Sequence, residues 1–167
     1  MEIRGLKIED AENLLAYFRD LVQADPERAE RVSDVEKFSV EDEKNWIRER
    51  LEGEKEKEIF ALCCENNGRI VAQGEVERQK RWIERHVTEI RFGVLPGYEE
   101  QAFEMVESLI RKARENKIEV LVYFHLASQK AGLSIIKKAG FSNAGVLEKY
   151  YKKDEEYIDR IYMSLIL

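Results

Sequence analysis

The chain has 167 residues, 44% of them hydrophobic and 37% charged, and its net charge is −6. This length and balance predict a single soluble globular domain over residues 1–167 and exclude an intrinsically disordered chain. The negative charge argues against wholesale nucleic-acid binding, and the lack of an apolar run of about 18 residues or of a signal-peptide pattern predicts a cytoplasmic protein with no membrane partner.

The first half of the chain alternates between strand-like and helix-like apolar patterns. Strands are predicted at Met1–Lys7, Ile59–Glu65 and Ile70–Glu77, and helices over Ala11–Ala24 and from Ser39 past Leu51. Asp10 is the expected N-cap of the first helix, and Ser39 with Asp42 resembles a capping box at the second. Asn67-Gly68 is typical of a hairpin turn. Residues 27–38 give no clear prediction.

The stretch from His86 to Asn116 carries the strongest pattern. Its strand ends at the turn pair Pro96-Gly97, and a long amphipathic helix follows. The apolar face of that helix comprises Ala102, Met105, Val106, Leu109, Ile110 and Ala113. A strand that leads into a helix N-terminus is a recurrent way to build an anion site, because the first N–H groups of the helix have no intrahelical acceptor.

The last third of the chain completes a mixed sheet. The predicted elements are a strand at Ile118–Leu126, a helix capped by Ser128 and stopped by Gly140, and strands at Ser142–Tyr151 and Tyr157–Leu167. The order β-α-α-β-β-β-α-β-α-β-β predicts an α/β (α+β) fold. We expect a mixed, mostly antiparallel sheet of six to seven strands flanked by about four helices.

Neither the cysteines nor the histidines indicate a metal site. Cys63 and Cys64 are neighbours in a strand, so they point to opposite faces and do not form an ordinary disulfide; we interpret them as buried apolar residues. No histidine lies near them in sequence, and His86 and His125 are too far apart to suggest a site.

The order of elements resembles that of the GNAT superfamily of N-acetyltransferases. Glu89–Val94 followed by Pro96 is similar to the central strand of that family. Ala139-Gly140-Phe141, then Gly145 and Tyr157–Leu165, resemble its common C-terminal motif. The resemblance covers nearly the whole chain and implies a GNAT-like fold.

The resemblance further implies that acetyl-CoA is a co-substrate. Its pantetheine arm would lie along the backbone of the central strand, and its pyrophosphate would lie at the N-terminus of the next helix. The cofactor-binding positions carried over from the family are Phe92, Gly93, Val94, Gln101, Ala102, Phe103, Glu104 and Gln129.

The phosphate loop departs from the family pattern. The family places basic residues and glycines where this chain has Glu99-Glu100-Gln101-Ala102-Phe103-Glu104, and only Ala102 is a near match. Acidic side chains near a pyrophosphate would weaken binding. Glutamates in the first turn also stabilise a helix by themselves, so two interpretations stay open: helix stabilisation, or an unusual CoA site.

The candidate catalytic residue is Glu89. Only a neutral amine attacks a thioester, and an alkylammonium has a pKa near about 10.4, so a base is needed. Several family members carry a carboxylate at this strand position; the alternative interpretation is a strand carboxylate paired with Arg91. Where the family has a tyrosine that acts as an acid, this chain has Ile136. Tyr150, Tyr151 and Tyr157 are nearby in sequence and are alternative candidates for the acid, although packing is the favoured interpretation of all three.

We therefore predict an acetyl-CoA-dependent N-acetyltransferase that acts on a small-molecule or peptide primary amine. A non-catalytic binding or regulatory module that has lost its phosphate loop is the alternative, and an enzyme with another acyl donor is a third reading. The sequence specifies neither the acceptor nor the oligomeric state, and a homodimer is compatible with it.

Overall fold

The computed structural model describes all residues from Met1 to Leu167 and has seven strands and five α-helices. In chain order the elements are β1 (Glu2–Gly5), α1 (Ala11–Ala24), α2 (Val32–Val35), α3 (Val40–Lys55), β2 (Ile59–Asn66), β3 (Arg69–Arg78), β4 (Val87–Val94), α4 (Glu99–Glu115), β5 (Val120–Leu126), α5 (Lys130–Lys138), β6 (Ser142–Lys153) and β7 (Glu156–Ile166). The predicted order of elements is confirmed, and α2 is an addition within the stretch that gave no prediction.

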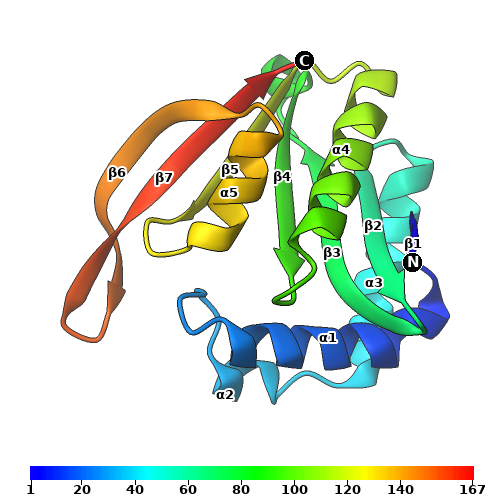
Figure 1. Ribbon diagram of the computed structural model, residues 1–167. Helices are drawn as coiled ribbons and strands as arrows, with labels where there is room; N and C mark the ends of the chain where they lie inside the picture. Colours follow the sequence, from blue (N-terminus) through cyan, green and yellow to red (C-terminus); the bar gives the residue numbers. More distant parts are fainter.

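All seven strands form one sheet in the order β1-β2-β3-β4-β5-β7-β6. Neighbouring strands are antiparallel except β4 and β5, which are parallel because α4 crosses over between them. Helices α4 and α5 cover one face of the sheet, α1 and α3 lie on the other, and the β6–β7 hairpin projects beyond the body (Figure 1). The predicted fold class is therefore confirmed.

The core has two parts, one on each face of the sheet. The larger cluster of 20 buried residues lies under α4 and α5, and the smaller cluster of 10 lies under α1 and α3. The predicted apolar face of α4 is fully engaged, because Ala102, Met105, Val106 and Leu109 are completely buried and Ile110 nearly so. Cys63 and Cys64 are free thiols buried on opposite faces, as predicted.

The cap of α1 and the start of β5 differ from the sequence prediction. Asp10 occupies the predicted N-cap position of α1, but its side chain makes no cap hydrogen bond, because its carboxylate pairs with Arg4 at 2.7 Å and accepts from Lys7 N. The strand predicted from Ile118 begins later, because Ile118 N donates to Ala113 O and so closes the C-terminus of α4. The Ser39–Asp42 capping box is present as predicted.

No helix combines the length and the apolar character that a membrane span requires.

Candidate active site

The centre of the molecule is a fork between the two parallel strands. β4 is the fourth of seven strands, so it is not at an edge of the sheet. It pairs with β5 only over Val87–Glu89, opposite Val120–Val122, although β4 continues to Val94 and β5 to Leu126. The two strands thus separate after Glu89 and Val122. The sheet is therefore open beside Gly93, and Figure 1 shows β4 and β5 diverging toward their C-terminal ends.

Backbone groups of β4 face into this fork without a strand partner. Leu95 donates its N–H to Val71 O on β3, and His86 O at the other end of β4 accepts from Val120 N on β5. Because successive residues of a strand direct their N–H and C=O to opposite sides, Phe92 and Val94 point theirs toward β5. They lie beyond the last β4–β5 pair. An extended chain with amide groups, such as a pantetheine arm, fits this edge.

The N-terminus of α4 lies at the open end of the fork and offers free N–H groups. The first helical hydrogen bond runs from Ala102 N to Tyr98 O, so the N–H groups of Glu99, Glu100 and Gln101 precede the first turn. The carboxylate of Glu99 accepts from Gly97 N at 3.1 Å, so the N–H of Gly97 is already occupied by a side chain of the loop.

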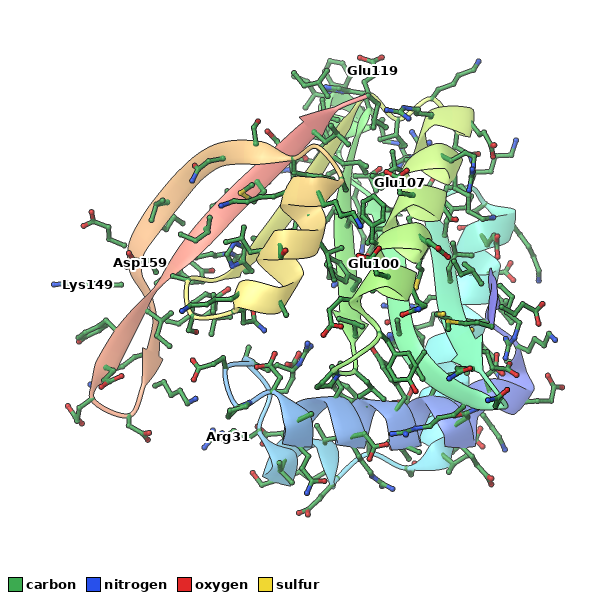
Figure 2. The ribbon with its side chains drawn as sticks, viewed as in Figure 1. Arg31, Glu100, Glu107, Glu119, Lys149 and Asp159 are labelled. Atoms are coloured by element: carbon green, nitrogen blue, oxygen red, sulfur yellow. The ribbon has the colours of Figure 1, made fainter.

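The other two acidic residues of the loop contact two different elements. Glu100, which Figure 2 labels in the first turn of α4, pairs with Lys138 of α5 at 2.8 Å. Lys138 Nζ also lies 4.1 Å from the centroid of the Phe103 ring. Burial raises the pKa of the Cys64 thiol on β2, and the negative charge of Glu104 adds to the rise. Glu104 therefore lies on the β2 side of α4. Glu99 and Glu100 are therefore the acids closest to a ligand at the helix N-terminus.

Gln129 is at the start of α5, and the Ser128 cap is absent. The N-cap of α5 is Gln129, whose Oε1 accepts from Leu126 N at 3.3 Å. Gln129 N donates to Leu126 O and so closes a turn before the helix. The helix therefore starts at Lys130, and Ser128 lies one residue before the N-cap position. The predicted cap is wrong, and Ser128 Oγ is buried without a partner.

On the α1/α3 face, a cavity of about 530 Å³ reaches the bottom of the fork. Gly93 lies at its base under α1, where a Cβ would come within 2.5 Å of Leu21 Cδ2 and 2.7 Å of Tyr17 Oη. Any side chain at Gly93 would therefore displace α1 or fill the cavity. The cavity is lined by Leu14, Tyr17, Phe18, Leu21, Arg28, Phe38, Asp42, Glu43, Asn45, Trp46, Glu49, Arg50, Gln73, Glu75, Arg91, Phe92 and Gly93.

The walls of this cavity are aromatic and charged. Ile47 of α3 is fully buried, whereas its neighbour Trp46 faces the cavity, with Arg50 at 4.3 Å from the centroid of its ring. Burial raises the pKa of Glu43, and the nearby Asp42 adds to the rise while Arg50 opposes it. The lining thus carries four carboxylates (Asp42, Glu43, Glu49 and Glu75) and three guanidinium groups (Arg28, Arg50 and Arg91), so it offers partners for both positive and negative groups of a ligand.

Glu89 lies on the same strand face as Gly93, four residues earlier, or about 13 Å along the backbone. It is half-buried, and burial raises the pKa of its carboxyl; Arg91 and then Arg160 oppose the rise, and Glu77 and Glu75 add to it. Arg91 Nε lies 3.4 Å from Glu89 Oε1.

Arg91 connects two cavities. It lines the cavity above Gly93 and also a polar cavity of about 480 Å³ that Glu89 borders. Its guanidinium contacts three carboxylates, with Nη2 2.9 Å from Glu75 Oε1 and 2.5 Å from Glu77 Oε2 in addition to the Glu89 contact. Arg91 therefore links Glu89 through its ion pairs to the cavity above Gly93.

Several buried polar atoms around the fork have no hydrogen-bond partner. They belong to Gln101 on α4, Ser128 before α5, His125 on β5 and Tyr17 on α1. Buried polar atoms are normally satisfied, and unsatisfied ones mark positions where a polar ligand or water supplies the partner. Tyr17 lines the cavity above Gly93, Gln101 lies in the first turn of α4, and Ser128 directly precedes the N-cap of α5. The fork therefore fits a polar, elongated ligand such as acetyl-CoA, while Glu99 and Glu100 make the phosphate end the least favourable part.

A profile described as the acetyltransferase (GNAT) domain matches residues 3–162 of the chain. The chain belongs to the GNAT acetyltransferase family. Curated protein sequences give no significant match.

Solved GNAT structures share the fold over the whole chain. The ribosomal-protein-alanine N-acetyltransferase of Brucella melitensis is 23% identical with a TM-score of 0.82, and each chain is covered completely. A GNAT acetyltransferase of Streptococcus pneumoniae is 18% identical with a TM-score of 0.88 over 99% of each chain. YncA of Salmonella typhimurium, a putative acetyltransferase solved with acetyl-CoA, is 16% identical with a TM-score of 0.82 over 99% of this chain and 93% of its own. At these identities the likeness establishes the fold alone.

Proposed function

We propose that this GNAT protein transfers an acetyl group from acetyl-CoA to a primary amine by direct attack. The observation that carries the proposal is the fork, which presents free backbone groups of Phe92 and Val94 on one side and opens at Gly93 into the 530 Å³ cavity on the other. Such a passage lets a thioester reach from the α4/α5 face to an acceptor on the α1/α3 face. Membership in the family and the acetyl-CoA complex of Salmonella YncA support this assignment.

The residues proposed to hold acetyl-CoA are those of the fork and of the α4 N-terminus. Phe92, Gly93 and Val94 border the pantetheine position, and the first turn of α4 with Gln101 and Ala102 offers the N–H groups for phosphate oxygens. Acetyl-CoA would supply the activated acyl group. The chain would supply orientation along β4 and exclusion of water beneath α1.

Glu89 is proposed to accept the proton that the amine gives up, through water. Burial favours its protonated form, which brings its pKa closer to neutrality than that of an exposed glutamate and so improves it as a base at physiological pH. Carboxylates of the cavity, such as Glu43, would hold the ammonium form of the acceptor before the proton leaves.

The test is release of CoA thiol from acetyl-CoA in the presence of amines that differ in size and charge: a small monoamine, a diamine and a peptide with a free N-terminus. Thiol release that depends on an amine and yields the acetylated product supports an N-acetyltransferase. Acetyl-CoA binding without turnover of any of these amines favours the second candidate, a non-catalytic binding module. Two observations support that candidate: the loop before α4 is acidic, and the N–H of Gly97 already donates to Glu99.

The acidic loop yields a prediction about affinity. The double variant Glu99→Arg/Glu100→Gly removes both carboxylates near the α4 N-terminus, so affinity for acetyl-CoA is expected to rise by about 10- to 100-fold, or about 1.4 to 2.7 kcal/mol. Glycine in the first turn costs helix stability, up to about 1 kcal/mol, so the melting temperature should fall as affinity rises. Calorimetric titration and thermal unfolding measure the two effects separately.

Glu104→Gln is the matched control. It removes one negative charge from the same helix, but on the β2 side, so affinity should change by less than about twofold because solvent and distance screen the charge. Equal gains from the control and the double variant would mean that overall charge, not the loop, limits binding.

A further inference from the structure

The charged side chains that line the cavity above Gly93 do not all pair with one another. Most of them have partners within the protein: Arg50, Arg91, Glu49 and Glu75 in ion pairs, and Asp42 in the capping box of α3. The carboxylate of Glu43 forms no ion pair. Arg28 binds only Glu30, outside the lining, through Nε at 3.1 Å, so both of its Nη groups are free. One positive and one negative group are thus left for a ligand.

The free end of Arg28 lies where the fork opens. A Cβ built on Gly93 would lie 3.7 Å from Arg28 Nη1, and the Arg28 side chain is only 17% exposed. Burial raises the pKa of Tyr17 on α1 and of Tyr123 on β5, and the charge of Arg28 opposes both rises. The guanidinium is therefore close to both walls of the fork.

The loop that carries Arg28 is fixed in place. Arg28 N donates to Asp25 O at 3.3 Å, and Glu27 N donates to Asp25 Oδ1 at 3.1 Å. Lys153 of β6 donates to Pro26 O at 2.6 Å and so ties the loop to the β6–β7 hairpin. Figure 1 shows the loop rising from the end of α1 toward the strands. A ligand at Arg28 therefore binds to a preformed position.

Two further hydrogen-bond donors lie beside Gly93 without an acceptor. Tyr17 Oη would lie 2.7 Å from a Cβ on Gly93, has no partner, and belongs to a residue that is 4% exposed. Gln73 lies opposite Gly93 in the β3–β4 register, and its buried Nε2 has no partner either. Both residues line the cavity. A guanidinium, a phenol and an amide thus surround one point, and a carboxylate, which only accepts hydrogen bonds, fits all three.

We propose that the acetyl acceptor is an amino acid and that Arg28 binds its carboxylate. The assignment rests on the proposed acetyl transfer and names its substrate class. The amine must reach the acyl carbon in the fork, and Arg28 Nη1 lies beside Gly93 at the same opening. The amine and the carboxylate are therefore only a few bonds apart, as in an α-amino acid. Glu43 remains for the ammonium group.

The reaction is that of the proposed function with this acceptor. The nitrogen forms a bond to the acetyl carbon, and the C–S bond breaks with its electron pair on sulfur. The proton that the nitrogen loses is matched by one that the sulfur takes from water, so the products are an N-acetyl amino acid and the CoA thiol.

Other acceptors fit this arrangement less well. A diamine brings a second positive charge toward Arg28, and like charges repel. A peptide N-terminus presents a neutral amide where the amino acid has its carboxylate. Hydrogen bonds between two charged groups are roughly twice as strong as neutral ones, so the peptide loses most of the contact with Arg28.

The test compares each of the common L-amino acids with its own α-amide, which keeps the amine and the side chain but has no negative charge. For the amino acid that the wild type turns over best, kcat/KM of thiol release should exceed that of its amide by about 10- to 100-fold. In Arg28→Gln this ratio should fall to within about threefold of unity, mainly through KM, because the contact binds substrate and transition state alike. The ratio is taken within one protein, so a general defect of the variant cancels.

Two more variants sharpen the comparison. Arg28→Lys keeps the charge but loses the planar pair of donors, so its ratio should lie between those of the wild type and Arg28→Gln. Arg31→Gln is the matched control, because Arg31 lies three residues later, is labelled in Figure 2 and has an 84% exposed side chain. It should keep the wild-type ratio.

Binding gives a readout that does not depend on turnover. Calorimetric titration in the presence of CoA, which carries no acetyl group, measures the affinity for the amino acid alone. The wild type should bind the amino acid about 10- to 100-fold more tightly than the amide, and Arg28→Gln should bind the two about equally.

Two results overturn the assignment while acetyl transfer stands: equal kcat/KM for amino acids and their amides in the wild type, or a ratio that Arg28→Gln leaves unchanged. If no amine of any class releases thiol, the proposed function is wrong, and calorimetry decides about the site. A wild-type protein that binds no amino acid more tightly than its amide would then show that Arg28 is not a carboxylate site.

Discussion

Glu89→Gln is expected to lower kcat by about 100-fold while changing the affinity for acetyl-CoA by less than about threefold, because a general base acts on the proton of the amine and not on the cofactor. The amide keeps the shape of the side chain and its place on β4. It cannot accept the proton, so the neutral amine must come from solution, where it is scarce below a pKa of about 10.4.

The pH profile separates a base from a packing residue. A base works in its ionised form, so kcat of the wild type should rise with pH as Glu89 ionises. Because burial raises its pKa, that rise should lie above the pH at which an exposed glutamate ionises. In Glu89→Gln this limb should disappear, and the remaining activity should follow only the ionisation of the amine. Steady-state kinetics over pH with one amine measure both profiles.

Glu77→Gln is the matched control for this variant. Glu77 lies opposite Glu89 in the β3–β4 register and also pairs with Arg91, so its loss disturbs the same ion-pair cluster. A control that retains turnover while Glu89→Gln loses it assigns the effect to the base. Loss of equal size in both variants would instead point to the cluster as a positioning device for Arg91.

Met105→Asp is expected to destabilise the folded protein by about 4 kcal/mol or more, because it buries an unpaired carboxylate in the larger core cluster. Met105 is completely buried between α4 and the sheet, next to Gly74 on β3. For a domain of this size the melting temperature should fall by on the order of 10 °C. Urea unfolding monitored by circular dichroism gives the free energy.

Glu104→Asp is the matched control for Met105→Asp, because it introduces an aspartate at the preceding residue, on the exposed side of α4. It changes helix propensity alone, so the cost should stay below about 1 kcal/mol. Similar unfolding free energies for the two variants would contradict the packing of α4 against the sheet.

The periodic parts of the fold were predictable because they depend on local pattern. The face of α4, the Asn67-Gly68 turn and the Ser39 capping box each follow from residues a few positions apart. The side chain of Asp10 does not cap α1 because Arg4 on β1 binds its carboxylate. Ser128 does not cap α5 because the turn after Leu126 shifts the start of that helix.

The candidate site was predictable only in part. The central strand and Glu89 could be located by resemblance, but no spacing in the sequence places the hydroxyl of Tyr123, on β5, against Gly132 of α5. The directions of Glu100 and Glu104 likewise depend on their contacts with α5 and β2. Sequence identified the acidic loop, and only the fold distinguishes which acids approach the helix N-terminus.

The most direct test of the account is calorimetric titration of the wild-type protein with acetyl-CoA at low and at high salt. The account predicts saturable binding of one acetyl-CoA per chain, with Kd below about 1 mM, that CoA displaces. It also predicts tighter binding at high salt, because salt screens the repulsion between the pyrophosphate and Glu99 and Glu100. No heat of binding at millimolar acetyl-CoA, at either salt concentration, would contradict the claim that the fork between β4 and β5 is an acetyl-CoA site.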